Sequence, residues 1–361
     1  MKAFRRLKRI SCSKQVKRND KVKDFSLFLK LVYTLNFIAA FMLLLACIAP
    51  YVTWELFSFL SFLSLIVPYL VLANIVFLLF WLFKWKKQFL ISFFVIALGY
   101  FTQGTFIKVI TPIDETKEGD ISLLTFNTHG FNGVKWANEP VSREKFVAFI
   151  NSQDADIICF QEYNYRVTKN FEHYPYKYVN FIFPPGKRVV QAIFSKYPII
   201  NKDSINFPNS SNNVIYADLL IKKDTVRVYN LHLQSLNVRP RSLKKEEPLR
   251  LYRRLNRSFQ KQQQQAQLVQ DHSQKVSYKK IICGDFNNTQ YSNVYNTIKG
   301  DMTDSFNVKG SGFGSTYLFK FLPFRIDFIL ADPEIEIKSH KNFKVRLSDH
   351  EPVMASFRLK E

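Results

Sequence analysis

Short apolar runs that end in polar residues recur along the last two thirds of the chain. Six of them read LLTFNTHG at 123–130, IICFQEY at 157–163, VYNLHLQS at 228–235, IICGDFNNT at 281–289, FRIDFIL at 324–330 and LSDHEPV at 347–353. Each run has the length and the β-branched or aromatic content of a strand. A buried strand has no structural need for a carboxylate or an imidazole at its end. The pattern therefore predicts strands that converge on one polar site, where carboxylates hold a hard cation and amides and imidazoles hold an anion.

The whole of residues 121–361 is interpreted as one α/β domain. Strand-like runs occur at 121–126, 156–160, 178–183, 189–194, 214–221, 225–231, 279–283, 325–330 and 352–358. One helix is predicted at 141–151, because Phe146, Val147 and Ile150 share a face. A second, at 244–275, has an apolar stripe at helical spacing that consists of Leu251, Leu255, Phe259, Ala266 and Val269. We interpret it as a surface helix whose basic cluster is a solvated face.

Two uncharged apolar stretches precede this domain, at 31–50 and 57–83. Both are long enough to cross a bilayer core of about 30 Å as helices, and Pro68 predicts a kink in the second. A third stretch, 89–107, becomes weaker after Thr102, and a re-entrant or interfacial segment is its alternative. The predicted organisation is a basic tail (1–30), a transmembrane region with three helices (31–110), a polar linker (111–120) and the α/β domain (121–361).

The charge distribution predicts the orientation of these spans. The formal net charge is +22, and Lys and Arg are concentrated in residues 1–30 and again at 84–88, whereas the link 50–56 contains neither. Basic loops stay in the cytoplasm. Three crossings therefore predict a multi-pass protein of the cell membrane with a cytoplasmic N-terminus and an extracytoplasmic domain; with only two crossings the domain stays inside. The excess charge favours polyanions or anionic membranes as neighbours without identifying a substrate.

The four cysteines do not indicate a metal site or a disulfide framework. Cys12 lies in the basic tail, Cys47 in an apolar span, and Cys159 and Cys283 within strand-like runs. Their spacing matches no metal-binding pattern, and a buried cysteine often acts as a small hydrophobic residue. The cysteines leave the compartment open.

Each polar run end, taken alone, has an ordinary explanation as a turn, a surface charge or a satisfied core histidine. Together and in this order they resemble the endonuclease/exonuclease/phosphatase superfamily, whose fold is similar to that of pancreatic deoxyribonuclease. The most specific motifs are GDFN at 284–287 and SDH at 348–350, with support from QE at 161–162 and RID at 325–327. The resemblance covers about 121–361. It implies an α/β fold, a four-layer α/β/β/α sandwich with the site at one end of two packed sheets.

The resemblance also implies hydrolysis of a phosphate ester with a divalent cation, Mg²⁺ or Mn²⁺. Glu162 would be the main metal ligand, helped by Asn127 and Asp349. The other implied roles are a phosphate contact for His232, positions beside the scissile phosphate for Asp285 and Asn287, and an ion pair between His350 and Asp327. Either Asp285 or His350 could take the proton of the attacking water.

Simple chemistry agrees with these roles. Mg²⁺ prefers oxygen ligands, and such an ion offsets charge on the phosphoryl oxygens and on the leaving group. A carboxylate such as Asp327 can orient His350 and stabilise its cationic form, although Asp327 could instead pair with Arg325. Some nucleases of the superfamily pair the histidine matching His232 with a carboxylate, whereas the corresponding stretch here, 188–195, contains no acid. We therefore expect His232 to act as a phosphate ligand.

The substrate stays open between two classes. LPFRIDFI at 322–329 lacks the Trp- and Arg-containing motif of inositol phosphatases, and membrane spans argue against DNA repair. A lipid or lipid-linked phosphodiester and an extracytoplasmic nucleic acid remain as substrates, with the lipid bilayer as the expected partner and no protein partner evident. The alternative from another class is a membrane scaffold that keeps the fold without turnover.

Overall fold

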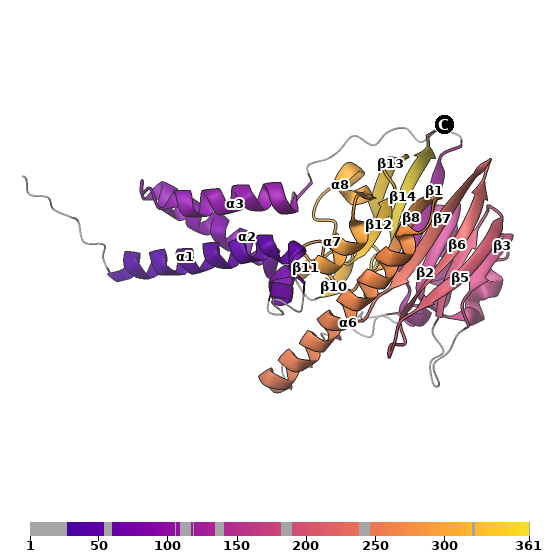
Figure 1. Ribbon diagram of the computed structural model, residues 1–361, viewed down its shortest axis with the longest axis horizontal. Helices are drawn as coiled ribbons and strands as arrows, with labels where there is room; N and C mark the ends of the chain where they lie inside the picture. The colour runs from indigo at the N-terminus through magenta and orange to yellow at the C-terminus, as the bar shows by residue number, and fades with distance from the viewer. Residues whose placement is uncertain are drawn as a thin grey trace, which may run out of the picture.

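The computed structural model describes residues 27–53, 60–104, 106–108, 117, 119–133, 141–181, 190–237, 246–319 and 322–360. Three helices come first, and a domain built on two β-sheets follows them (Figure 1). Most of the predicted basic tail and linker lies outside the described residues.

The N-terminal helices are α1 (Leu27–Ile48), α2 (Leu60–Phe83) and α3 (Phe89–Gln103), with a short 3₁₀ turn, η1 (Ala49–Tyr51), after α1. They pack side by side, and the domain lies at the end where α1 and α3 finish and α2 begins (Figure 1). By length and composition, two segments could each cross a membrane. One is α1 together with η1, and the other is α2. The third helix has 15 residues, about 23 Å of helix, so it is shorter than the predicted span.

A polar network lies buried at the centre of this bundle. Asn36 Nδ2 donates to Ser92 Oγ over 2.6 Å, and Trp81 Nε1 donates to Asn36 Oδ1 over 2.9 Å. Ser92 Oγ in turn donates to Asn74 Oδ1 over 3.1 Å. These side chains are fully buried, and a buried polar group is costly unless it is hydrogen-bonded. The network therefore ties all three helices together in one register.

The domain contains two six-stranded mixed sheets and a two-stranded ribbon. In spatial order, the first sheet consists of β13 (Ile335–Asn342), β14 (Val353–Leu359), β1 (Ile121–Asn127), β2 (Ile157–Tyr163), β4 (Val190–Ser195) and β3 (Tyr176–Val179). The second consists of β5 (Ile199–Asn206), β6 (Asn213–Ile221), β7 (Asp224–His232), β8 (Lys279–Asp285), β12 (Asp327–Ala331) and β9 (Thr303–Asp304). The ribbon pairs β10 (Tyr317–Phe319) with β11 (Leu322–Phe324).

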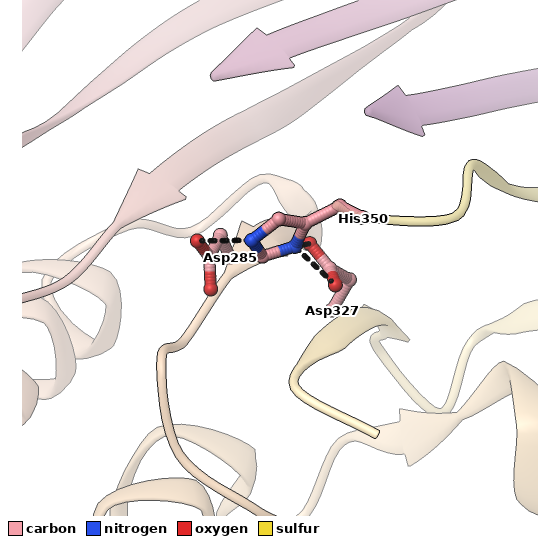
Figure 2. Close-up of side chains that lie close together, drawn as sticks. All are labelled: Asp285, Asp327 and His350. Carbon is pink, nitrogen blue, oxygen red and sulfur yellow. Dashed lines mark hydrogen bonds and ion pairs between the residues drawn. The ribbon is translucent and has the colours of Figure 1, made fainter. Parts of the chain in front are cut away.

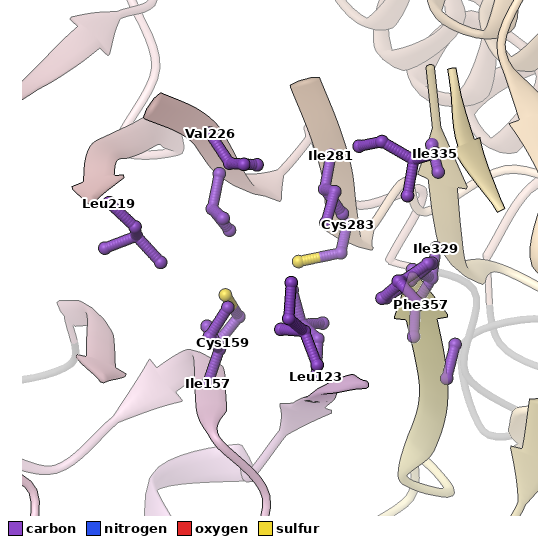
Figure 3. Packing of buried hydrophobic residues seen from close by; sticks show 14 of the residues in the cluster. Leu123, Ile157, Cys159, Leu219, Val226, Ile281, Cys283, Ile329, Ile335 and Phe357 are labelled. Atoms are coloured by element: carbon purple, nitrogen blue, oxygen red, sulfur yellow. The ribbon is translucent and has the colours of Figure 1, made fainter. Parts of the chain in front are cut away.

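The main core lies between the two sheets (Figure 3). Successive side chains of a strand point to opposite faces, so every second residue of the central strands faces the other sheet. Leu123, Ile157, Ile281 and Ile329 are examples, and all are fully buried. Cys159 and Cys283 also belong to this core, as free thiols with their sulfurs facing each other.

Helices cover the outer faces of both sheets. On the first sheet lie α4 (Arg143–Gln153) and the 3₁₀ segment η3 (Tyr165–Phe171), which share an aromatic core with β1, β2 and β4. On the second lie α6 (Pro248–Gln274) and α7 (Asn293–Lys299). Of the predicted stripe on α6, Leu255, Phe259, Ala266 and Val269 are buried. Two shorter elements, η2 (His129–Phe131) and α8 (Ser305–Lys309), complete the described helices.

Two long strands, β5 and β13, were not predicted from the sequence, and each lies at the edge of its sheet. The burial pattern of β5 is mostly exposed or intermediate, and β13 carries Glu336, Lys338 and Lys341. An edge strand needs no continuous apolar run, so the hydrophobic pattern did not reveal them. The strand predicted at 178–183 corresponds to β3, which begins at Tyr176 and ends at Val179, and residues 182–183 lie outside the described residues.

Gly284 allows the parallel strands β7 and β8 to approach each other at the end that carries Asp285. It has φ = 126° and pairs in register with Leu231. A Cβ at this position would lie 2.2 Å from the Leu231 carbonyl oxygen. Only glycine combines this backbone conformation with this contact.

We predict that Gly284→Ala destabilises the domain by at least about 3 kcal/mol, because steric overlap with backbone adds to the φ strain. The measurement is chemical or thermal unfolding of the purified protein. Gly312→Ala is the matched control, since Gly312 also has a positive φ of 70° but has nothing within 4 Å of its Cβ position. Equal losses in the two variants would contradict the role of the β7–β8 contact.

Candidate functional site

A pocket of about 490 Å³ opens at one end of the two sheets. Six of the eight predicted site residues line it: Glu162, His232, Asp285, Asn287, Asp349 and His350. The other two, Asn127 and Asp327, contact lining residues through hydrogen bonds. The structure therefore brings all eight residues into one site.

The strand alternation explains why these side chains meet. Asn127, Asp285 and Asp327 continue the same inward-facing rows as the core residues Leu123, Ile281 and Ile329. Neighbouring strands end at the same level: Asp285 pairs in register with His232 of β7 and with Asp327 of β12. Asn127 and Asp285 are the last residues of β1 and β8, and Asp327 is the first residue of the antiparallel strand β12, so the three side chains collect at one edge.

Asp285, Asp327 and His350 form the buried centre of the site (Figure 2). The Nδ1 atom of His350 lies 2.9 Å from Asp327 Oδ2 and 3.1 Å from Asp327 Oδ1. Its Nε2 atom lies 3.6 Å from Asp285 Oδ2. The imidazole thus stands between two carboxylates, with one nitrogen toward each.

The alternative partner considered for Asp327 belongs to another network. The Arg325 guanidinium donates to Asp304 Oδ2 over 2.8 Å and lies over the rings of Phe306 and Phe328. Arg325 therefore supports the fold through Asp304, while Asp327 contacts His350.

Burial and charge shift the proton affinities of this centre. Burial raises the pKa of Asp285 to about 6, and the neighbouring His350 opposes that rise. Burial alone would lower the pKa of His350, but Asp327 and Asp285 outweigh it and hold that pKa well above its ordinary value. Such shifts result when opposite charges share a site of low polarity.

Hydrogen bonds fix the Asp285 carboxylate. Asn127 Nδ2 and Asn287 Nδ2 each donate to Asp285 Oδ2 over 3.0 Å, and the Asn287 backbone N–H donates to Asp285 Oδ1 over 2.8 Å. Asn287 Nδ2 also donates to the Leu233 carbonyl. Both amide hydrogens of Asn287 are therefore already used, which makes it a positioning residue for Asp285 in this structure.

Glu162 and Asp349 form a second, more open group of carboxylates. Their side chains are 32% and 26% exposed and line the pocket. His129 lies between them, with Nδ1 3.6 Å from Glu162 Oε2 and 3.8 Å from Asp349 Oδ1. Glu162 adopts a left-handed backbone conformation, φ = 48°. Strain of this kind is concentrated at functional sites, and here it accompanies a carboxylate at the pocket wall.

His232 occupies the opposite side of Glu162. Its Nε2 atom lies 3.8 Å from both Glu162 Oε1 and Asp285 Oδ2. The ring is therefore aimed into the pocket from the end of β7. We expected the stretch 188–195 to offer no acidic partner to His232. Residues 188–189 of that stretch lie outside the described residues.

The sequence did not single out several other pocket residues. His129 belongs to the first polar run, and its signal was its place two residues after Asn127. Gln234 belongs to the third polar run, and Ser211 and Asn212 come from a loop without a distinctive motif. Leu65 comes from α2, and a leucine in an apolar span carries no signal for a site.

The donor set suits a hard divalent cation. Two groupings are candidates: the carboxylates of Glu162 and Asp349 with the Asn127 amide, and the buried group Asp285, Asp327 and His350, which could also hold a metal ion. Oxygen ligands that line an open pocket suit Mg²⁺, which prefers oxygen ligands and keeps several waters. In the buried group, His350 Nδ1 is already bonded to Asp327, and Nε2 remains as its ligand atom.

Comparison with known proteins agrees with the fold. A domain of unknown function (DUF8431) matches residues 29–106, and a search of curated proteins found no match. An endonuclease/exonuclease/phosphatase from Beutenbergia cavernae is 15% identical, with a TM-score of 0.51 over 67% of this chain and 72% of its own. TDP2 of D. rerio with a single-strand DNA product is 14% identical, with a TM-score of 0.51 over 67% and 100%. The human Nocturnin catalytic domain with bound sulfate is 15% identical, with a TM-score of 0.50 over 69% and 97%.

At such identities the structures establish the fold alone, a deoxyribonuclease-like arrangement of two mixed sheets. The sequence adds the family, because a single family profile spans both the QE and SDH motifs. The endonuclease/exonuclease/phosphatase profile matches residues 124–350, well over half of the chain, and the chain belongs to this family.

Proposed function

We propose that the protein is a membrane-anchored, divalent-metal-dependent phosphoesterase that hydrolyses phosphodiester bonds. The observation that carries this proposal is the meeting of Glu162, Asp285 and His350 in one pocket, with Asp327 bonded to His350. The family consists mostly of metal-dependent phosphoesterases and nucleases, and a complete set of acids, amides and imidazoles is the usual sign of a working site.

Glu162, Asn127 and Asp349 would hold the Mg²⁺ or Mn²⁺ ion. When bound, such an ion offsets negative charge on the phosphoryl oxygens and on the leaving group. Glu162 and Asp349 supply the carboxylates. Asn127 links this group to Asp285 through its donated hydrogen bond, so the metal ligands and the buried centre share one rigid support.

The remaining residues act on water and phosphate. Asp285 orients the attacking water and accepts its proton, because Asn127 and Asn287 hold its carboxylate in place. Asp327 holds His350 through Nδ1, which leaves the Nε2–H of His350 to stabilise charge on a phosphate oxygen. His232 donates to the phosphate from the other side of the pocket.

The anchor is the N-terminal bundle, which would cross the membrane three times. Only 28% of the most apolar window of α1 and of α2 is buried, and α1 exposes Phe37 and Phe41. Exposed apolar surface of this extent marks contact with a partner or with lipid. The alternation of α1, α2 and α3 would leave the N-terminus in the cytoplasm and the domain outside.

A nuclease acting outside the cytoplasm is the second candidate function. It is favoured by Arg250, Arg253 and Arg257, which are exposed on α6 and could contact a phosphate backbone. A scaffold that keeps the fold without turnover is the alternative to both enzymes.

The test of the proposed function is turnover of bis(para-nitrophenyl) phosphate by the full-length protein in detergent. We expect hydrolysis with Mg²⁺ or Mn²⁺, and its loss after chelation and its return when metal is added back. A protein that binds Mn²⁺ yet hydrolyses neither this diester nor DNA, RNA or phospholipid would be a scaffold.

We predict that Glu162→Gln weakens Mn²⁺ binding about tenfold or more, since it removes a charged ligand and keeps the shape. Binding is measured by electron paramagnetic resonance of free Mn²⁺, independently of activity. Asp327→Asn is the comparison variant and should bind Mn²⁺ nearly as the wild type does. Weak Mn²⁺ binding by Asp327→Asn, with nearly normal binding by Glu162→Gln, would assign the ion to the buried group with His350.

We predict that Asp327 and His350 act as one unit. Asp327→Asn and His350→Ala should each lower kcat by roughly 10² or more, and the double variant should be little worse than His350→Ala alone. Asp304→Asn is a matched control, because it removes another buried carboxylate and should lower Tm more than kcat. If the losses in kcat of the two single variants multiply in the double variant, Asp327 and His350 act independently and the prediction is wrong.

The predicted topology is checked with reporters. A reporter fused after Glu361 should report an extracytoplasmic location, because 1–30 and 84–88 are basic and 50–56 is not. A reporter inserted at 84–88 is the internal control and should be cytoplasmic. A cytoplasmic signal from the C-terminal fusion would mean that α3 does not cross.

A further inference from the structure

The beginning of α2 contacts the loop that follows Asp285. The Thr289 hydroxyl donates to the Ser64 carbonyl over 2.8 Å, and both residues are buried. In a helix the Ser64 carbonyl would accept from the N–H of residue 68, but that residue is Pro68, which has no N–H. The proline therefore leaves a carbonyl unpaired within the helix, and the loop after Asp285 supplies its hydrogen bond.

Further contacts hold the same loop against the bundle. Tyr291 is buried within the apolar cluster of the three helices, and its ring lies 5.7 Å from that of Phe106. Asn293 Nδ2 donates to the Pro50 carbonyl over 3.0 Å. The segment from Thr289 to Asn293 is thus bonded to α2 and to the turn after α1. These contacts hold the beginning of α2 beside the site.

This contact puts a residue of α2 into the pocket wall. Leu65 follows Ser64 and lines the pocket together with Leu236, Phe324 and Ile326. These apolar side chains share the pocket with the carboxylates of Glu162 and Asp349. The pocket therefore combines a polar site for phosphate and metal with an apolar wall that continues into the helix bundle.

Leu65 lies near the end of α2 that is next to the domain. The 24 residues of α2 make a helix of about 36 Å, which exceeds a bilayer core of about 30 Å. Leu65 lies in the second turn from the end next to the domain (Figure 1). If α2 spans the bilayer, this turn lies at the boundary between lipid and domain, where the head of a membrane lipid would enter the pocket.

We infer that Leu65 and its apolar neighbours form a subsite for a hydrocarbon chain, so the substrate is a phosphodiester that carries one and reaches the site from the bilayer. This inference rests on the proposed phosphodiesterase function. The head group enters the polar side of the pocket, while the chain lies along α2. Leu65 is a specificity-determining residue, and Thr289 is a positioning residue that holds α2 beside the loop.

The test uses full-length protein in detergent and three diesters that share one chromogenic leaving group. They are methyl para-nitrophenyl phosphate, dodecyl para-nitrophenyl phosphate and the para-nitrophenyl ester of thymidine monophosphate. We expect kcat/KM to be at least about tenfold higher for the dodecyl ester than for the other two, since burial of a chain against apolar side chains favours binding. The same preference should appear without metal, as tighter binding of dodecyl phosphonate than of methyl phosphonate.

Two variants test the wall itself. Leu65→Ala should lower the dodecyl-to-methyl ratio of kcat/KM several-fold, and the matched control Leu72→Ala should keep the ratio, because Leu72 is 59% exposed on the same helix. Thr289→Val should lower kcat for all three esters, and Thr289→Ser, which keeps the hydroxyl, should restore it. Melting temperatures are measured alongside to detect loss of folding.

The outcomes separate the two proposals. Turnover of all three esters at similar kcat/KM, or an equal ratio in Leu65→Ala and wild type, would overturn the subsite while the phosphodiesterase function stands. Preference for the thymidine ester would assign the site to nucleic acid. Absence of metal-dependent turnover of every ester would overturn the proposed function and the subsite with it.

Discussion

The site depends on one constraint, the two-residue alternation of strands packed face to face. A side chain that points between the sheets must be apolar or must find a polar partner, because an unpaired buried polar group is costly. The inward rows of β1, β2, β7, β8 and β12 are apolar through the middle of the core and carry polar residues toward the end next to the pocket. The polar residues can be buried only because they bond to one another: Gln161 donates to Thr125 and Asn230, and Asn127 donates to Asp285.

This arrangement gives the site its rigidity. The network of Gln161 and Asn230 joins the first sheet to the second directly beneath the pocket. Gly284 brings β7 and β8 together just before His232 and Asp285. Several of the carboxylates and imidazoles therefore rest on strands and not on loops alone, and side chains on strands are positioned more precisely than side chains on loops.

The N-terminal helices contribute to the candidate site. Pro68 frees the Ser64 carbonyl, Thr289 bonds to it, and Leu65 then faces the pocket. A proline within a helix is tolerated where a neighbour satisfies the freed group, and here the neighbour is Thr289 of the loop that follows Asp285. The buried network of Asn36, Asn74 and Ser92 holds α2 against the other two helices. Hydrogen bonds thus join α2 to the other two helices through Asn74, and to the domain through the Ser64 carbonyl.

The sequence by itself determined the central strands, the apolar helices and the residues that gather at the candidate site, because these follow from local periodicity and from polar residues at strand ends. Only the tertiary structure decided which of these residues touch. It paired Asp327 with His350 and Arg325 with Asp304, and it occupied both amide hydrogens of Asn287. It also placed Leu65 in the pocket through a hydrogen bond between residues 225 positions apart. Contacts over such separations depend on how whole elements pack, and no local pattern of apolar and polar residues encodes them.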